Sequence, residues 1–75
     1  MAGDGPAQNN LGVLYRDGHG VRHDLCQAAY WFAQSAASGY KEGMKNYARA
    51  LEKGEGVEKD TVEAACWRQK GNEQD

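Results

Sequence analysis

The chain repeats itself at an offset of 36 residues. The segment GHGVRHD, residues 18–24, returns as GEGVEKD, residues 54–60. The same offset pairs Asn10 with Asn46 and Trp31 with Trp67, and it gives nine identities among the 39 positions that can be compared. A period of this length is typical of stacked helical repeats. The repeat therefore favours a protein that offers a binding surface over one that encloses an active site.

Size and charge exclude several classes of function. The 75 residues form one small domain, 1–75, which we divide into repeat one at about 3–38 and repeat two at about 39–74. A net charge of −2 does not fit a nucleic-acid-binding protein, which needs a clustered basic face. No segment is apolar and long enough to span a membrane, and the N-terminus lacks the pattern of a secretory signal. We expect neither nucleic acid nor membrane as a partner, and the cytoplasm is slightly favoured.

Four helices are predicted, two in each repeat, so the fold class is an all-α superhelix (solenoid) of two antiparallel helix pairs. We expect them over about residues 6–17, 25–38, 40–53 and 61–69, with Pro6 in the first turn. Apolar residues at helical spacing predict the inward faces. In chain order these are Ala7, Leu11, Leu14 and Tyr15; Leu25, Ala28, Ala29, Phe32 and Ala36; Met44, Tyr47, Ala48 and Leu51; and Val62, Ala65 and Cys66.

The two glycine-bearing loops predict how the helices of each repeat are joined. Gly18 and Gly54 suit the left-handed position at the end of a helix. Val21 and Val57 are the apolar residues of the loops, and we expect each to fill the gap between its two helices. An aspartate should cap the next helix, with a Gln or Glu three residues later completing a capping box. The two pairs are Asp24 with Gln27, and Asp60 with Glu63.

Three motifs of repeat one carry a family likeness: NLGVLY at 10–15, GxGVxxD at 18–24 and AAxWF at 28–32. They resemble the Sel1-like repeat, a relative of the tetratricopeptide repeat with a longer, glycine-bearing loop. Repeat two departs from the pattern with Tyr47-Ala48 in place of Leu-Gly and with Arg68 in place of an aromatic residue. The resemblance implies a right-handed superhelix and a role as an adaptor or scaffold that bridges proteins. It implies no shared catalytic residues and no cofactor.

The resemblance also predicts where a partner binds. In the tetratricopeptide fold the first helix of each pair lines the concave face. Amide and cationic side chains there would suit a peptide carboxylate or an acidic side chain. The opposing interpretation is that these are ordinary solvated helix faces. The six residues expected to be exposed and to bind the partner are Asn9, Val13 and Arg16 in repeat one, with Lys45, Arg49 and Glu52 in repeat two.

A second candidate surface is apolar. It consists of the uncovered N-terminal side of the first helix or the faces near Trp31 and Trp67. Exposed aromatic patches dominate the energetics of interfaces. The recurrence of tryptophan at one repeat position instead favours packing in the core.

The sequence gives little support for a metal site or a catalytic site. His19, His23 and Cys26 lie close together in sequence, but the two histidines become Glu55 and Lys59 in repeat two, as expected for solvated loop positions. Residues 38–41 match a Ser-x-x-Lys pattern without the other motifs of that enzyme class. We expect no metal site and no catalytic residue.

The cysteines and the number of repeats leave alternatives open. Cys26 and Cys66 occupy different repeat positions, and we expect both to be buried, reduced thiols, with a disulfide between them as the alternative. Two repeats are fewer than the three usually needed for stability. Structural capping or self-association within a longer array is therefore the main alternative to partner binding, and a small thiol or hydrolytic enzyme is a remote one.

Overall fold

The structure is a computed structural model that describes residues 4–73. Its four helices are α1 (Gly5–Asp17), α2 (Leu25–Ala37), α3 (Lys41–Lys53) and α4 (Thr61–Asn72). The prediction of two helix pairs is therefore confirmed, although α4 continues three residues past its expected end. It continues through Gly71 because that residue is buried against α3. Gly3 and residues 74–75 of the expected repeats lie outside the described residues.

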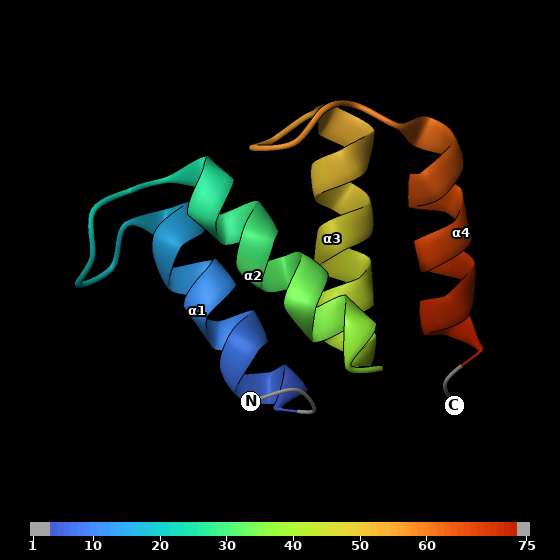
Figure 1. The fold of residues 1–75 in the computed structure, drawn as a ribbon, viewed down its shortest axis with the longest axis horizontal. Helices are drawn as coiled ribbons and strands as arrows, with labels where there is room; N and C mark the ends of the chain where they lie inside the picture. Colours follow the sequence, from blue (N-terminus) through green and yellow to red (C-terminus); the bar gives the residue numbers. More distant parts are fainter. Residues whose placement is uncertain (1–3, 74–75) are drawn as a thin grey trace.

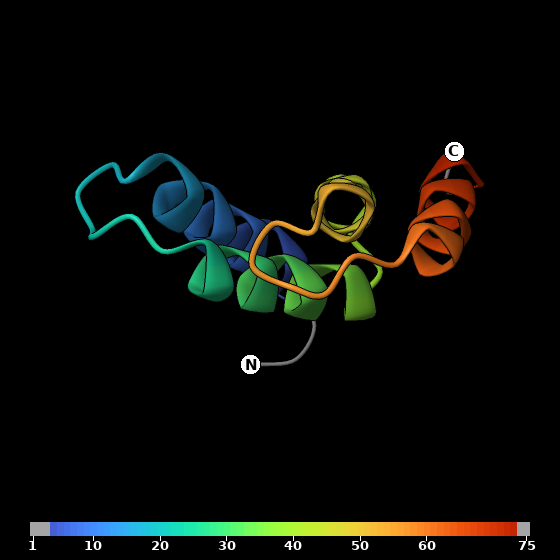
Figure 2. The same ribbon diagram turned by 90° about the horizontal axis from the view of Figure 1, so that it is seen from above.

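Consecutive helices run in opposite directions, and the two glycine-bearing loops lie at the same end of the molecule (Figure 1). Helix α2 packs against both α1 and α3, while α4 packs against α3. Helix α1 also contacts α3, whereas α2 and α4 are splayed apart (Figure 2). This difference curves the stack, so that α1 and α3 lie on its inner, concave side.

The core consists mainly of alanines. In α2 the predicted inward residues Ala28, Ala29, Phe32 and Ala36 are buried, and Leu25 is half-buried. Short side chains let the helix backbones approach closely, which a stack with so few large residues requires. In repeat two, Tyr47, Val57 and Trp67 pack against the buried cluster of Ala48, Leu51 and Ala64. The expected places of Val57 and of the inward face of α3 are confirmed.

The predicted inward face of α1 is wrong at two of its four positions. Leu11 and Tyr15 are half-buried, but Ala7 and Leu14 are exposed, and the buried residues are Gly5, Gln8, Asn9 and Gly12. The reason is the close approach of α2: a Cβ atom at Gly12 would lie 2.5 Å from the ring of Phe32. The packed face of α1 therefore needs small residues, and part of its apolar stripe remains exposed.

The predicted inward face of α4 is also wrong. Val62, Ala65 and Cys66 are exposed, and the side chain that is buried there belongs to Ala64, with Trp67 half-buried beside it. Helix α4 has a packed neighbour, α3, on one side. Ala65 occupies the repeat position of Ala29, which is buried because α3 covers it.

The loops form as predicted, with one difference in the caps. Gly18 and Gly54 end α1 and α3 in the left-handed conformation. The carboxylates of Asp24 and Asp60 each accept a hydrogen bond from the backbone three residues later, at 3.1 and 2.9 Å. Their own backbone N–H groups, however, donate to the carbonyl oxygens of Tyr15 and Leu51. The reciprocal half of the capping box is therefore replaced by a bond that closes each loop.

Gln8 carries a buried amide oxygen without a hydrogen-bond partner among the described residues. Its repeat equivalent is the buried Met44. We expect Gln8→Met to raise the free energy of unfolding by about 1–2 kcal/mol, because it removes an unsatisfied polar group and keeps the volume.

Urea denaturation followed by circular dichroism measures this effect. Asn9→Leu is the contrasting variant, because it leaves Asn46 without the acceptor of its 2.8 Å hydrogen bond and should lower the denaturation midpoint. A lower midpoint for Gln8→Met as well would show that the amide of Gln8 is satisfied in solution.

Candidate functional site

The candidate binding surface lies on the inner side of the stack, on α1 and α3. Lys45, Arg49 and Glu52 are exposed on α3, and Val13 and Arg16 are half-buried on α1. These residues occupy equivalent positions of the two repeats, since Val13 pairs with Arg49 and Arg16 with Glu52 at the 36-residue offset. We call these five residues the inner surface.

The expected exposure of Asn9 is wrong. Its side chain is 9% exposed, and its amide oxygen accepts a 2.8 Å hydrogen bond from Nδ2 of Asn46 on α3. Asn9 is covered because α3 lies directly beside α1. Lys45, its repeat equivalent on α3, is exposed because no further helix of the described chain covers that side.

Arg16 is already engaged within α1 and α2. Its Nε atom lies 3.1 Å from a carboxylate oxygen of Asp17, and its guanidinium carbon lies 5.8 Å from the centre of the Phe32 ring. The hydrogen bond from Arg16 is the main reason that the pKa of the Asp17 carboxyl is lowered, and the charge of Arg49 contributes further. The contribution of Arg49 is the smallest of the causes, so Asp17 is neutralised mainly from within α1.

Glu52 is held by a residue of α4. Both of its carboxylate oxygens accept hydrogen bonds from the guanidinium of Arg68, each at 3.1 Å. This bidentate pair lowers the pKa of Glu52 and raises that of Arg68. Arg68 and Glu52 occupy the repeat positions of Phe32 and Arg16, so an ion pair in repeat two replaces an aromatic–cation contact in repeat one.

Lys45 and Arg49 are the cations of the inner surface that remain available. Both are exposed, and neither has a hydrogen bond or an ion pair with another residue in the part of the chain that the structure describes. They are four positions apart on α3, which places their side chains next to each other on the helix surface. The carboxylate of Glu52 does not cancel their charge fully, because Arg68 already neutralises it.

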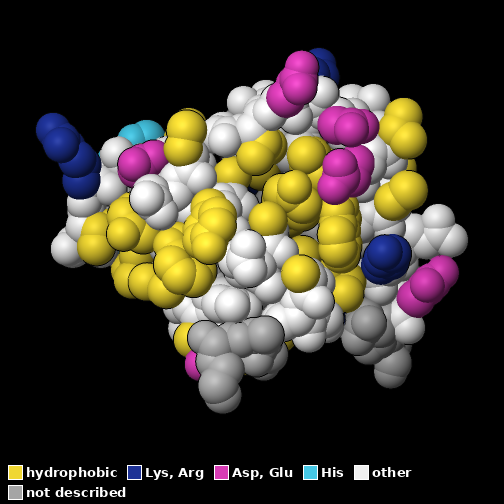
Figure 3. All heavy atoms as spheres, in the orientation of Figure 1, with side chains coloured by type: hydrophobic (Ala, Val, Ile, Leu, Met, Phe, Trp, Pro, Cys, Tyr) yellow, Lys and Arg dark blue, Asp and Glu magenta, His cyan; other side chains and the backbone are white. Residues whose placement is uncertain are grey.

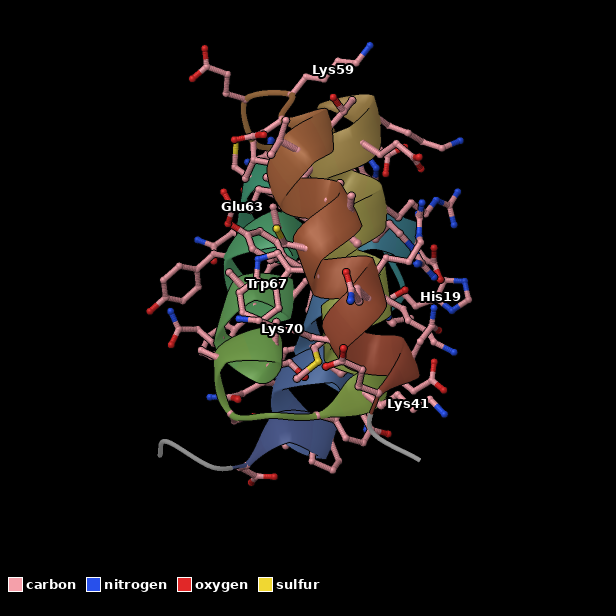
Figure 4. The ribbon with its side chains drawn as sticks, turned by 90° about the vertical axis from the view of Figure 1, so that its right-hand side faces the viewer. His19, Lys41, Lys59, Glu63, Trp67 and Lys70 are labelled. Carbon is pink, nitrogen blue, oxygen red and sulfur yellow. The ribbon has the colours of Figure 1, made fainter. Side chains whose placement is uncertain are left out.

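Trp31 is half-buried on α2, with its ring centroid 5.1 Å from that of Tyr30, and Trp67 lies toward the outer side of the stack, opposite the inner surface (Figure 4). Figure 3 shows hydrophobic side chains gathered there in two areas, one toward α1 and α2 and one between α2 and α4. Trp67 is half-buried, contacts the ring of Tyr47 with centroids 5.9 Å apart, and donates a 3.1 Å hydrogen bond to Glu63. Lys70 covers the ring at 4.7 Å (Figure 4). Trp67 therefore packs in the core, as its recurrence predicted.

The structure also locates the residues considered for other chemistry. Cys26 and Cys66 are free cysteines, and both are exposed, so the expectation that they are buried is wrong. Each lies on a side of its helix that no neighbouring helix covers. Within residues 4–73 no three His, Cys, Asp or Glu side chains come together as metal ligands would. None of the described helices is long and apolar enough to cross a membrane.

Comparison with known proteins identifies the repeat. The family model described as the Sel1 repeat matches residues 5–40 and again residues 41–75. A Sel1 repeat protein from Oxalobacter formigenes is 37% identical with a TM-score of 0.90, and the match covers 95% of this chain and 29% of that one. A protective antigen of uropathogenic Escherichia coli strains that displays an SLR fold is 39% identical with a TM-score of 0.91, over 96% of this chain and 15% of that one.

These matches extend over less than a third of each solved structure, so the chain spans a small part of the length of both. No curated protein sequence matches the chain significantly. The high TM-scores nevertheless show that both helix pairs have the α–α superhelical arrangement of these repeats.

Proposed function

Because the chain belongs to the Sel1 repeat family, whose members are generally non-catalytic protein-interaction modules, we propose that it binds an acidic peptide segment of another protein on the inner surface. The observation that carries the proposal is the pair of exposed, unpaired cations Lys45 and Arg49 on α3, one of the two helices on the inner side of the stack. Lysine and arginine form their strongest hydrogen bonds with carboxylates.

The spacing of the two cations supports an extended peptide. Side chains four residues apart on a helix are roughly 6 Å apart, and alternate side chains of an extended strand are separated by roughly 7 Å on one face. Two carboxylates at alternate positions of a peptide would therefore meet Lys45 and Arg49 together. Val13, half-buried on α1 at the repeat position of Arg49, offers an apolar contact beside them.

Arg16 and Glu52 have supporting roles in this proposal. Arg16 neutralises Asp17, and Arg68 does the same for Glu52, so these two carboxylates of α1 and α3 repel an acidic peptide less. Asn9 holds α1 against α3 through Asn46 and sets the spacing of the two helices without touching the partner.

A charge-reversal experiment tests the proposal. The probe is a capped, fluorescent peptide of about eight residues in which aspartate and leucine alternate, measured by fluorescence anisotropy. We expect Lys45→Glu/Arg49→Glu to weaken binding about tenfold or more, because two charge-assisted contacts are replaced by repulsion. A peptide with asparagine in place of aspartate should bind neither protein tightly.

The matched control is Arg22→Glu/Lys59→Glu. It changes the net charge by the same amount at two exposed positions in the loops. We expect this variant to bind the probe as the parent chain does. An equal loss in both variants would mean that the peptide responds to net charge alone, and no loss in either would overturn the inner surface as the binding site.

A further inference from the structure

We propose that a second copy of this chain docks head to tail on α4, so that its α1 lies against α4 as α3 lies against α2 within one chain. The surfaces involved lie at the two open edges of the stack. The residues at the equivalent positions of α2 and α3 already pack against each other within one chain. The proposal rests on this continuity with an existing interface and is independent of peptide binding.

The contact between α2 and α3 is the template. Gly43 on α3 lies so close to Ser35 that a Cβ atom there would overlap the serine, and Gly56 of the second loop lies in the same way on the carbonyl oxygen of Leu25. The second loop reaches back over α2 (Figure 2). Asn46 bonds to Asn9 across α1 and α3, and the buried residues Ala29 and Ala50 line one small hollow between the helices.

The residues of the two open edges are found from the α2–α3 contact at the 36-residue offset. Adding 36 to the contact residues of the first repeat gives the edge at α4, and subtracting 36 from those of the second repeat gives the edge at α1. The first edge carries Lys45, Thr61 and Ala65, which are exposed, and Gly71, which is backed by α3; these are equivalent to Asn9, Leu25, Ala29 and Ser35. The second edge is exposed throughout and is equivalent to Gly43, Asn46, Ala50 and Gly56. It consists of Ala7, Asn10, Leu14 and Gly20.

The two edges match in chemistry pair by pair. Ala7 of one copy would pack on Gly71 of the other. This pair again combines a glycine with a small side chain, as Gly43 and Ser35 do within one chain. Leu14, which is 37% exposed, would cover Ala65. The remaining two pairs use polar groups. The amide oxygen of Asn10 can accept a hydrogen bond from Lys45. A Cβ atom added at Gly20 would meet no atom of its own chain within 4 Å apart from its sequence neighbours, so Gly20 leaves room for the carbonyl of Thr61.

The loops differ in charge. With neutral histidines, the loop at 18–24 has no net charge, because Arg22 offsets Asp24. In the loop at 54–60, Lys59 offsets only one of the three acidic residues Glu55, Glu58 and Asp60, which leaves a net charge of −2. In the proposed stack the first loop of one copy lies beside the second loop of the other, and this register avoids the like-charge repulsion of two second loops.

In this interface each copy contributes a different surface, α1 from one and α4 from the other. Two copies therefore leave one α1 edge and one α4 edge free, and further copies can join. Each added chain leaves another free edge, so the assembly grows beyond a dimer as concentration rises. A symmetric contact of α4 with α4 would instead stop at two copies. Sedimentation velocity from about 10 μM to about 1 mM distinguishes growth from a closed dimer.

Two single substitutions test the edges separately. Gly20→Ala should leave a folded chain whose association is weakened about tenfold or more, because its Cβ atom would overlap the neighbouring copy. Gly39→Ala is the matched control: the φ of Gly39 is +92°, a Cβ atom added there would meet no atom within 4 Å apart from its sequence neighbours, and the residue lies between the repeats of one chain. It should associate as the parent chain does. Ala65→Glu blocks the other edge at an exposed helical position.

Mixing the two blocked variants gives the decisive result. Gly20→Ala retains an intact α4 edge and Ala65→Glu retains an intact α1 edge, so the mixture should form a one-to-one complex that neither variant forms alone. A monomeric parent chain at all concentrations would overturn the proposal. So would undiminished association of Ala65→Glu, or the absence of a complex in the mixture.

Discussion

Gly56→Ala is expected to destabilise the chain by about 2–5 kcal/mol, far more than the equivalent change Gly20→Ala in the first loop. Both glycines have a left-handed backbone, with φ of +76° and +79°, and an alanine there costs about 1–2 kcal/mol at either site. Only Gly56 also lies against a neighbouring repeat, where a Cβ atom would overlap the carbonyl of Leu25 and come within 2.9 Å of the Cys26 nitrogen. Overpacking of this kind adds about 1–3 kcal/mol.

The comparison of these two variants isolates the coupling between the repeats. A chain of 75 residues has a free energy of unfolding of about 4–11 kcal/mol, so Gly56→Ala should remove a large fraction of it. Urea denaturation by circular dichroism, at a concentration low enough to keep the chain monomeric, gives both values. Equal losses in the two variants would mean that the second loop does not rest on α2 in solution.

Phe32→Ala is expected to cost about 3–5 kcal/mol. Phe32 is 3% exposed, its ring fills the space above Gly12, and the guanidinium of Arg16 lies over it. The smaller side chain would leave a cavity between α1 and α2 that the glycine on the opposite helix cannot fill. The loss is a large fraction of the stability of so small a domain.

Tyr30→Ala on the same helix is the control for Phe32→Ala. Tyr30 is 54% exposed, so its truncation removes a large aromatic residue with little buried surface and should cost less than about 1 kcal/mol. Thermal unfolding of both variants measures the difference. If the two variants unfolded at the same temperature, Phe32 would not be the residue that holds the first helix pair together.

The repeat made most of the fold predictable. Glycines at fixed positions and an aspartate before each second helix specify the loops and the caps through local chemistry, and local chemistry is visible in the sequence. The inward faces of α2 and α3 were also predicted correctly, because both helices have neighbours on two sides and bury apolar stripes.

The faces of α1 and α4 were not predictable from apolar spacing. These end helices have an open edge, so their apolar residues Leu14 and Val62 remain in contact with solvent. Their packed faces consist instead of small or polar residues such as Gly12, Ala64 and Gly71. A hydrophobic pattern carries no information on which edge of a stack stays uncovered.

The sequence predicts the exposed cations of the candidate site but not its buried asparagine. Exposure of Lys45 and Arg49 follows from helical phase, but the burial of Asn9 depends on Asn46, which is 37 residues away. The recurrence of asparagine at positions 10 and 46 was a signal for a structural role. The joint change of Arg16 and Phe32 to Glu52 and Arg68 was another, because a pair of compensating substitutions indicates contact.

Binding of an acidic peptide on the concave side of the stack is tested most directly by nuclear magnetic resonance. The chain is titrated with the aspartate–leucine peptide, its backbone amide chemical shifts are followed, and the asparagine–leucine peptide is the control. We expect saturable shifts at Val13, Arg16, Lys45 and Arg49, and none of comparable size at Tyr30. Shifts centred on Trp67 or Val62, or shifts of equal size with the uncharged peptide, would contradict binding of an acidic peptide on the concave side.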